Sequence, residues 1–153
     1  MQTPTEPLSR RVIVDHLDLH HKRLNGTWYV DTLISKVMSI LGNNVANIYT
    51  QGKFIKVYPI MERREAGYSL IDFTDNVGVY ETLLTDGSGE FTGWNTEFVK
   101  HAKRIQTKLQ NSEQGRHNQN HAAEHEIGSL ANHSRRRTTK KVILKQLWYF
   151  GIV

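Results

Sequence analysis

A chain of 153 residues with 38% hydrophobic residues is long enough for one domain with its own core, and this composition excludes an intrinsically disordered protein. It has no cysteine for disulfides or thiolate zinc sites, no apolar run of the roughly 18 residues that span a membrane and no secretory signal, so we expect a soluble, intracellular protein without a membrane partner. Residues 1–99 contain 9 Lys or Arg against 12 Asp or Glu, whereas residues 100–153 contain 11 against 3, which makes the C-terminal third the part expected to bind a polyanion.

The first half of the chain predicts three consecutive antiparallel strands. Residues 26–34, GTWYVDTLI, are rich in β-branched and aromatic side chains. Residues 45–50 and 54–60 follow after breaks at LGNN and QGK, which favour tight connections. We interpret residues 1–25 as an N-terminal extension and residues 26–153 as the core domain.

Helices and strands then alternate. From Glu65, apolar residues recur at helical spacing, and Gly78 follows where a C-terminal cap is expected. Residues 80–85 predict a fourth strand, and residues 95–105 predict a helix with Asn95 or Thr96 as its N-cap. Residues 104–110 are compatible with a short fifth strand.

The last part of the chain predicts two further helices. Residues 118–141 contain no proline and carry apolar residues at helical spacing, and residues 142–152 form an amphipathic pattern. Strands mixed with helices in this order indicate an α/β layered domain.

Three acidic residues lie in positions that favour metal binding. Asp31 lies inside the first predicted strand, Asp86 directly follows the fourth, and Glu124 lies on the long predicted helix, with 54 and 37 residues between them. An aspartate inside an apolar strand is unfavourable unless something pairs with it. Hard divalent cations prefer carboxylate oxygens, and two metals roughly 3.5 to 4 Å apart can support phosphodiester chemistry. Asp86 has a second interpretation as the first residue of an Asp-Gly turn, and the two roles are compatible.

These residues lie in segments that resemble a known family. LHHKRLNGTWYVDT, LLTDGSGEF, QNHAAEHEIG and LKQLWYFGIV are similar, in order and spacing, to the catalytic cores of the retroviral integrase superfamily, and within it to copia-type retrotransposon integrases. The resemblance implies a ribonuclease H-like α/β fold, with a mixed five-stranded sheet flanked by helices. It also implies Mg²⁺ or Mn²⁺ as cofactor and a D,D,E triad of Asp31, Asp86 and Glu124, which act as catalytic residues and metal ligands.

The same resemblance implies a function and partners. The expected function is DNA 3′-end processing and strand transfer, which together integrate a retrotransposon. The expected partners are the element ends and target DNA, further copies of the chain in a homo-oligomer, and the remainder of the retrotransposon polyprotein. Integration would take place in the nucleus.

The sequence departs from the family pattern at several places. No Asn follows Asp86, and the second spacing is slightly longer than is common in the family. Gly128 and Ala131 occupy helix positions where retroviral relatives carry DNA-contacting lysines. The N-terminal His-His-Cys-Cys zinc module of complete integrases is not present, because the chain has no cysteine.

A basic run near the C-terminus is the predicted nucleic-acid-binding surface. Lysine and arginine side chains release counterions when they neutralise phosphates, which gives affinity that does not depend on sequence. A solvated helix face is the alternative interpretation of such a run. The residues concerned are Arg135, Arg136, Arg137, Lys140 and Lys141.

Three other functions are compatible with the sequence. The chain could be a catalytically decayed core that binds nucleic acid, or a ribonuclease H-like nuclease unconnected with integration. HAAEH, residues 121–125, also matches a zinc-protease pattern, with His117 on the same helix face. A catalytic zinc needs another protein ligand, however, and no Asp or Glu follows Glu126.

Overall fold

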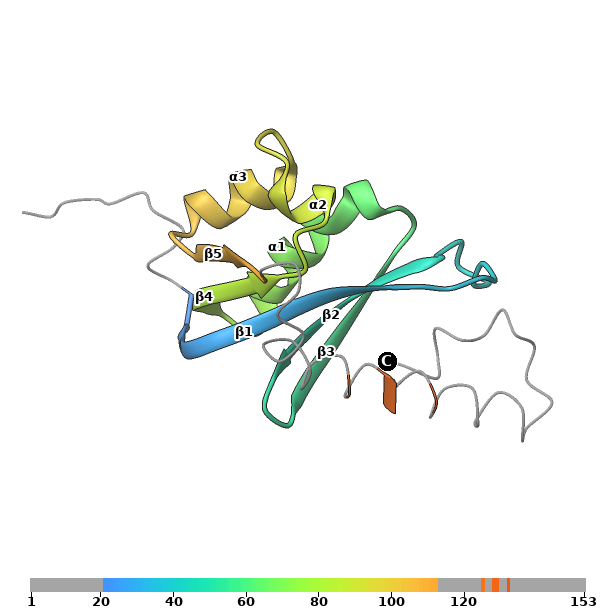
Figure 1. Cartoon of the computed structure of the whole chain (residues 1–153), viewed down its shortest axis with the longest axis horizontal. Coiled ribbons are helices and arrows are strands. Elements are labelled where there is room, and N and C mark those ends of the chain that lie inside the picture. The colour runs from blue at the N-terminus through green and yellow to red at the C-terminus, as the bar shows by residue number, and fades with distance from the viewer. Residues whose placement is uncertain (1–20, 113–124, 126–127, 130–131, 133–153) are drawn as a thin grey trace, which may run out of the picture.

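The computed structural model describes residues 21–112, 125, 128–129 and 132 (Figure 1). This part of the chain forms a five-stranded sheet with the strand order β3-β2-β1-β4-β5. The strands are β1 (Arg23–Ile34), β2 (Val45–Gln51), β3 (Phe54–Ile60), β4 (Val79–Thr85) and β5 (Lys108–Asn111). The helical elements are the 3-10 turn η2 (Arg63–Glu65) and the helices α1 (Ala66–Asn76), α2 (Gly89–Thr92) and α3 (Glu97–Arg104).

The sheet is mixed. Strands β1, β2 and β3 pair antiparallel in sequence order, as their short connections predict. Strand β4 then pairs in parallel with β1 after the crossover through α1, and β5 pairs in parallel with β4 after α3. Helices α1 and α3 pack against each other on one side of the sheet (Figure 1). The mixed five-stranded sheet flanked by helices that the resemblance implied is therefore confirmed.

Strand β1 begins three residues earlier than the sequence predicted. Arg23 and Leu24 pair with the start of β4, and the register shifts between Leu24 and Thr27. Gly26 lies within this irregularity with a φ of 85°, a conformation that glycine adopts without strain. The glycine expected to open the strand instead lies in a bulge inside it.

The two helices predicted from Glu65 and over residues 95–105 are present, with small differences at their ends. Glu65 is the last residue of η2, and α1 begins at the next residue, Ala66. The Glu65 side chain accepts a hydrogen bond from the backbone N–H of Met61 at 2.9 Å. Gly78 has a φ of 136°, and its N–H donates to the Phe73 carbonyl at 3.3 Å, as expected of a C-terminal cap. Thr96 is the N-cap of α3. Helix α2 was not predicted, because four residues are too few to show helical periodicity.

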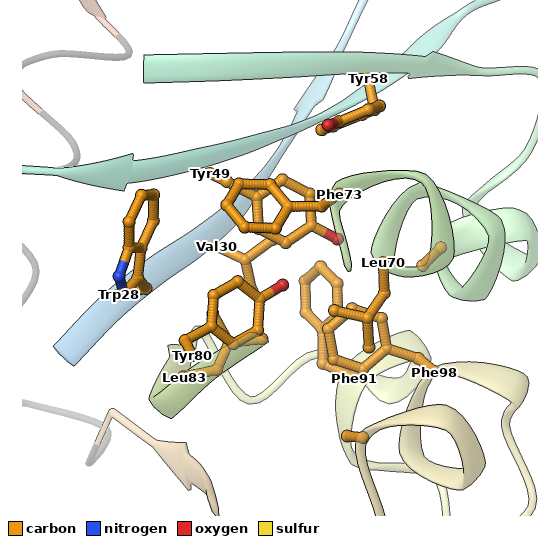
Figure 2. Close-up of a cluster of buried hydrophobic side chains, with 12 residues drawn as sticks. Trp28, Val30, Tyr49, Tyr58, Leu70, Phe73, Tyr80, Leu83, Phe91 and Phe98 are labelled. Carbon is orange, nitrogen blue, oxygen red and sulfur yellow. The ribbon is translucent and has the colours of Figure 1, made fainter. Parts of the chain in front are cut away.

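An aromatic cluster fills the core between the sheet and the helices (Figure 2). Phe73 of α1 lies at its centre, with ring centroids 4.8 Å from Tyr49, 4.9 Å from Tyr80 and 5.2 Å from Trp28. Burial raises the pKa of Tyr49 and of Tyr80 above the ordinary tyrosine value, so both hydroxyls stay protonated at neutral pH. The cluster fixes α1 on strands β1, β2 and β4.

Replacing Phe73 by Ala should lower the free energy of unfolding by about 3 to 5 kcal/mol, because it opens a cavity among packed rings. Chemical denaturation monitored by circular dichroism measures this change. Tyr68→Ala is the matched control, since Tyr68 lies on the same helix and is 64% exposed, and its effect should stay within about 0.5 kcal/mol. Equal losses in the two variants would contradict this account of the core.

Most of the two helices predicted at the C-terminus lies outside the described residues. His125, Gly128, Ser129 and Asn132 are helical, which agrees with the prediction for residues 118–141 at these four positions. The helix predicted over residues 142–152 is not described. None of the helices in the described part of the chain is long and apolar enough to cross a membrane.

Candidate active site

The structure places two of the three predicted carboxylates in or directly after neighbouring strands. Val30 of β1 is the register partner of Thr85 of β4, and the two strands are parallel. Asp31 and Asp86 directly follow these partners, which are the last paired residues of two adjacent strands about 4.8 Å apart. Asp31 is also the register partner of Ile48 on β2, so it shares the sheet face opposite the one to which Val30 contributes.

Hydrogen bonds hold the backbone around Asp31. Its Oδ1 accepts a hydrogen bond from the N–H of Thr32 at 2.7 Å, and the side chain is half-buried. The Thr32 hydroxyl donates to Oδ1 of the buried Asn47 at 3.2 Å. Asn47 Nδ2 in turn donates to the Ser69 hydroxyl at 2.8 Å, and Ser69 donates to the Ala66 carbonyl in the first turn of α1. This chain of buried polar groups ties the strand that carries Asp31 to the helix layer.

Asp86 makes the turn contacts that the sequence suggested. Its Oδ1 accepts hydrogen bonds from the N–H of Ser88 at 3.0 Å and from the Ser88 hydroxyl at 2.7 Å. Gly87 between them has a φ of 78°. The turn role of Asp86 is therefore confirmed. The turn contacts use only Oδ1 of Asp86, and the side chain is exposed. Metal binding through Oδ2 is compatible with this turn.

The remaining predicted site residues lie outside the described part of the chain. This applies to Glu124 and to the basic residues Arg135, Arg136, Arg137, Lys140 and Lys141. Their roles stay predictions. The same holds for the zinc-protease pattern, because only His125 of that motif is described, and it is exposed.

The two aspartates are chemically suited to a hard divalent cation. One lies in β1 and the other directly follows the adjacent strand β4, and Mg²⁺ is commonly held by one or two carboxylates together with water and substrate phosphates. Among the described residues, no group of three or more His, Cys, Asp or Glu side chains could hold a metal ion. A complete site would therefore need a further ligand from elsewhere in the chain, and the predicted Glu124 is of the right type.

Two contacts made by residues at or after the C-terminal ends of the strands were not predicted. The Thr85 hydroxyl donates to Oδ1 of Asn111 at 3.0 Å, joining the ends of β4 and β5. Arg63 Nε lies 3.8 Å from Oε1 of Glu90 in an ion pair between η2 and α2. Both contacts join residues 26 or 27 positions apart, so local sequence patterns could not reveal them. The position of Glu90 in the DGSGEF segment was the one available signal.

Comparison with solved structures identifies the architecture. The chain superposes on a chain of the simian T-cell lymphotropic virus intasome in complex with PP2A regulatory subunit B56 gamma, with a TM-score of 0.67 and 11% identity over 86% of this chain and 50% of that one. The fold is that of retroviral integrase catalytic cores. The catalytic core domain of BIV integrase matches with a TM-score of 0.62 and 9% identity, over 83% of this chain and 80% of that one. The HTLV-2 integrase catalytic core domain, in complex with magnesium and in a trimeric form, matches with a TM-score of 0.63 and 12% identity, over 84% and 82%.

Sequence comparisons add no assignment to this structural likeness. No family model matches the chain, and no curated protein matches it either. The chain spans half the length of the simian T-cell lymphotropic virus chain, and about four fifths of the two isolated core domains. The likeness at this low identity establishes the ribonuclease H-like fold.

Proposed function

We propose that this chain is the catalytic core of a copia-type retrotransposon integrase, which performs metal-dependent 3′-end processing and strand transfer of DNA. The observation that carries the proposal is that Asp31 and Asp86 directly follow Val30 and Thr85, which are paired on adjacent parallel strands of an integrase-type fold. The resemblance of the DGSGEF segment and of the segment around Glu124 to this family supports the same conclusion.

In the proposed reaction, Asp31, Asp86 and Glu124 hold Mg²⁺ or Mn²⁺. The bound cations would supply activation of the attacking oxygen and stabilisation of the leaving oxygen. The Thr32 amide keeps Asp31 oriented through its hydrogen bond, and the turn at Ser88 does the same for Asp86. Fixed carboxylates of this kind reduce the reorganisation needed when substrate binds.

The proposed partners are DNA, other copies of this chain and the remainder of the retrotransposon polyprotein. The trimeric form of the HTLV-2 core domain and the intasome of simian T-cell lymphotropic virus support DNA binding and self-association as proposals for this chain. Action in the nucleus follows from the proposed reaction, because the target DNA is there.

DNA binding should be electrostatic and depend on the basic run near the C-terminus. Changing Arg135, Arg136 and Arg137 to Ala should reduce the slope of log affinity against log salt by about 0.9 for each phosphate of duplex DNA that the chain no longer neutralises. Fluorescence anisotropy at several salt concentrations measures this slope. An unchanged slope in the triple variant would show that the basic run is only a solvated surface.

A strand-transfer assay tests the proposed function directly. Purified full-length chain is incubated with labelled duplexes that carry the element ends, with Mn²⁺ or Mg²⁺, and the products are resolved on a denaturing gel. Joined products support an integrase. Cleavage without joining would replace this function by that of a ribonuclease H-like nuclease, and binding without either would indicate a decayed nucleic-acid-binding module.

A further inference from the structure

The Arg63–Glu90 ion pair joins two segments that leave the sheet at the same end of their strands. Strand β3 runs in the same direction as β1, because both are antiparallel to β2. The C-terminal ends of β3, at Ile60, and of β4, at Thr85, therefore lie at the same end of the sheet. Arg63 follows Ile60 by three residues, and Glu90 follows Asp86 by four. The ion pair connects the segment after β3 with the segment that begins at Asp86.

The two partners of this ion pair differ in exposure. The Glu90 side chain is 8% exposed, whereas the Arg63 side chain is 52% exposed. Phe91, the next residue, is buried against Phe98 with ring centroids 4.8 Å apart, which fixes the short helix that carries Glu90. Glu90 is therefore the anchored partner, and Arg63 is the partner that solvent or a ligand can reach.

The contact between them is a charge attraction without a hydrogen bond. The Nε to Oε1 distance of 3.8 Å exceeds the hydrogen-bond range, and Oε1 of Glu90 is buried without a hydrogen-bond partner. Within the described part of the chain, the Arg63 guanidinium donates no hydrogen bond. Its N–H groups thus remain able to bind a ligand, while the buried carboxylate restricts where the guanidinium lies.

The adjacent arginine is in a different situation. Arg64 Nε lies 2.6 Å from Oε2 of Glu62, two residues earlier, and both side chains are largely exposed. This is a local surface ion pair. Arg63 and Arg64 have the same formal charge and adjacent positions, so they form a matched pair for experiments.

We propose that Arg63 is a DNA-phosphate-binding residue of the site formed by Asp31 and Asp86, held in place by Glu90. This inference rests on the proposed function, because it takes DNA as the ligand. A DNA backbone that approaches two aspartates is repelled by their charges, and a cation at the same edge offsets this repulsion. A guanidinium offers a planar fork of N–H donors that matches two phosphate oxygens.

The test compares single variants of the full chain on one fluorescent DNA duplex over a series of salt concentrations. Arg63→Ala should lower the slope of log affinity against log salt by about 0.9, the value expected when one phosphate fewer is neutralised. Arg64→Ala removes the same formal charge and should change the slope by less than half as much. Arg63→Lys should keep the slope and bind several-fold more weakly, because lysine cannot form the bidentate contact.

Glu90→Gln tests the holding role, because glutamine keeps the shape of the buried side chain and removes its charge. In this background, Arg63→Ala should weaken DNA binding less than it does in the wild-type chain. An equal loss of affinity in both backgrounds would overturn the role of Glu90.

Two results would overturn the role of Arg63 itself. Equal slope changes in Arg63→Ala and Arg64→Ala would mean that only net charge matters. A lower melting temperature of Arg63→Ala with an unchanged slope would mean that the ion pair only connects two segments. If the wild-type chain binds this duplex without salt dependence, the proposed DNA-binding function fails, and the inference fails with it.

Discussion

Asp31→Asn and Asp86→Asn should each reduce metal-dependent strand transfer by more than about 100-fold, since even changes in groups that only support metal ligands cost roughly 10- to 100-fold. Asparagine keeps the oxygen that accepts from the Thr32 amide in the first case and from Ser88 in the second. Each variant therefore removes negative charge without removing the local hydrogen bond. The strand-transfer assay with Mn²⁺ measures the loss of activity, and thermal denaturation confirms that the fold is intact.

Asp72→Asn is the control for these two variants. Asp72 is an exposed carboxylate on α1, and its replacement should leave strand transfer within about twofold of the wild-type rate, as expected for a surface change away from the site. If Asp31→Asn and Asp86→Asn retain wild-type activity, the two neighbouring aspartates are not the metal site. If they lose activity together with thermal stability, the assay measures folding and a different function must be considered.

Glu124→Gln should abolish strand transfer, and Glu126→Gln should have little effect. Two residues on a helix are separated by about 200° of rotation, so only one of these side chains can face the strands that carry the aspartates. Glu124 is the expected ligand because it, and not Glu126, matches the Glu of the Q-N-x-x-A-E pattern in the integrase resemblance. DNA binding and melting temperature should remain close to wild type in both variants.

The contrast between the two glutamates makes the assignment testable by mutation. A loss of activity confined to Glu126→Gln would move the metal ligand by two residues. Equal losses would mean that the helix contributes charge in general. Activity in Glu124→Gln would exclude it from the catalytic triad.

Local patterns predicted most of the described fold. The predictions of β2 and β3 were confirmed because their apolar and β-branched runs are separated by a short connection. Strand β3 ends in Pro59–Ile60 before the turn η2. Helix α1 was correct because Ala66, Leu70 and Phe73 recur on its buried face. In each case the determining residues lie within about a dozen positions of one another.

Contacts between distant residues were beyond such patterns. The parallel pairing of β1 with β4 joins residues 55 positions apart, as in Val30 with Thr85. Only the family resemblance, through its mixed sheet, implied such a pairing. The bulge at Gly26 and the four-residue helix α2 also lack a periodic signal. For the site, the sequence indicated Asp31 and Asp86, which the structure places directly after paired residues of adjacent strands, but no sequence pattern indicated the contact between Glu90 and Arg63.

Strand β1 pairs with β2 on one side and with β4 on the other, and this arrangement affects the order in which the protein folds. Its antiparallel partner β2 begins 11 residues after β1 ends, so this hairpin can form quickly from local contacts. Its parallel partner β4 requires closure of a much longer loop, which costs more chain entropy before any contact compensates. Asp31 and Asp86 are therefore expected to meet only in the late steps of folding. A nascent or partly folded chain would have its carboxylates apart, and it would gain the ability to bind metal together with its native topology.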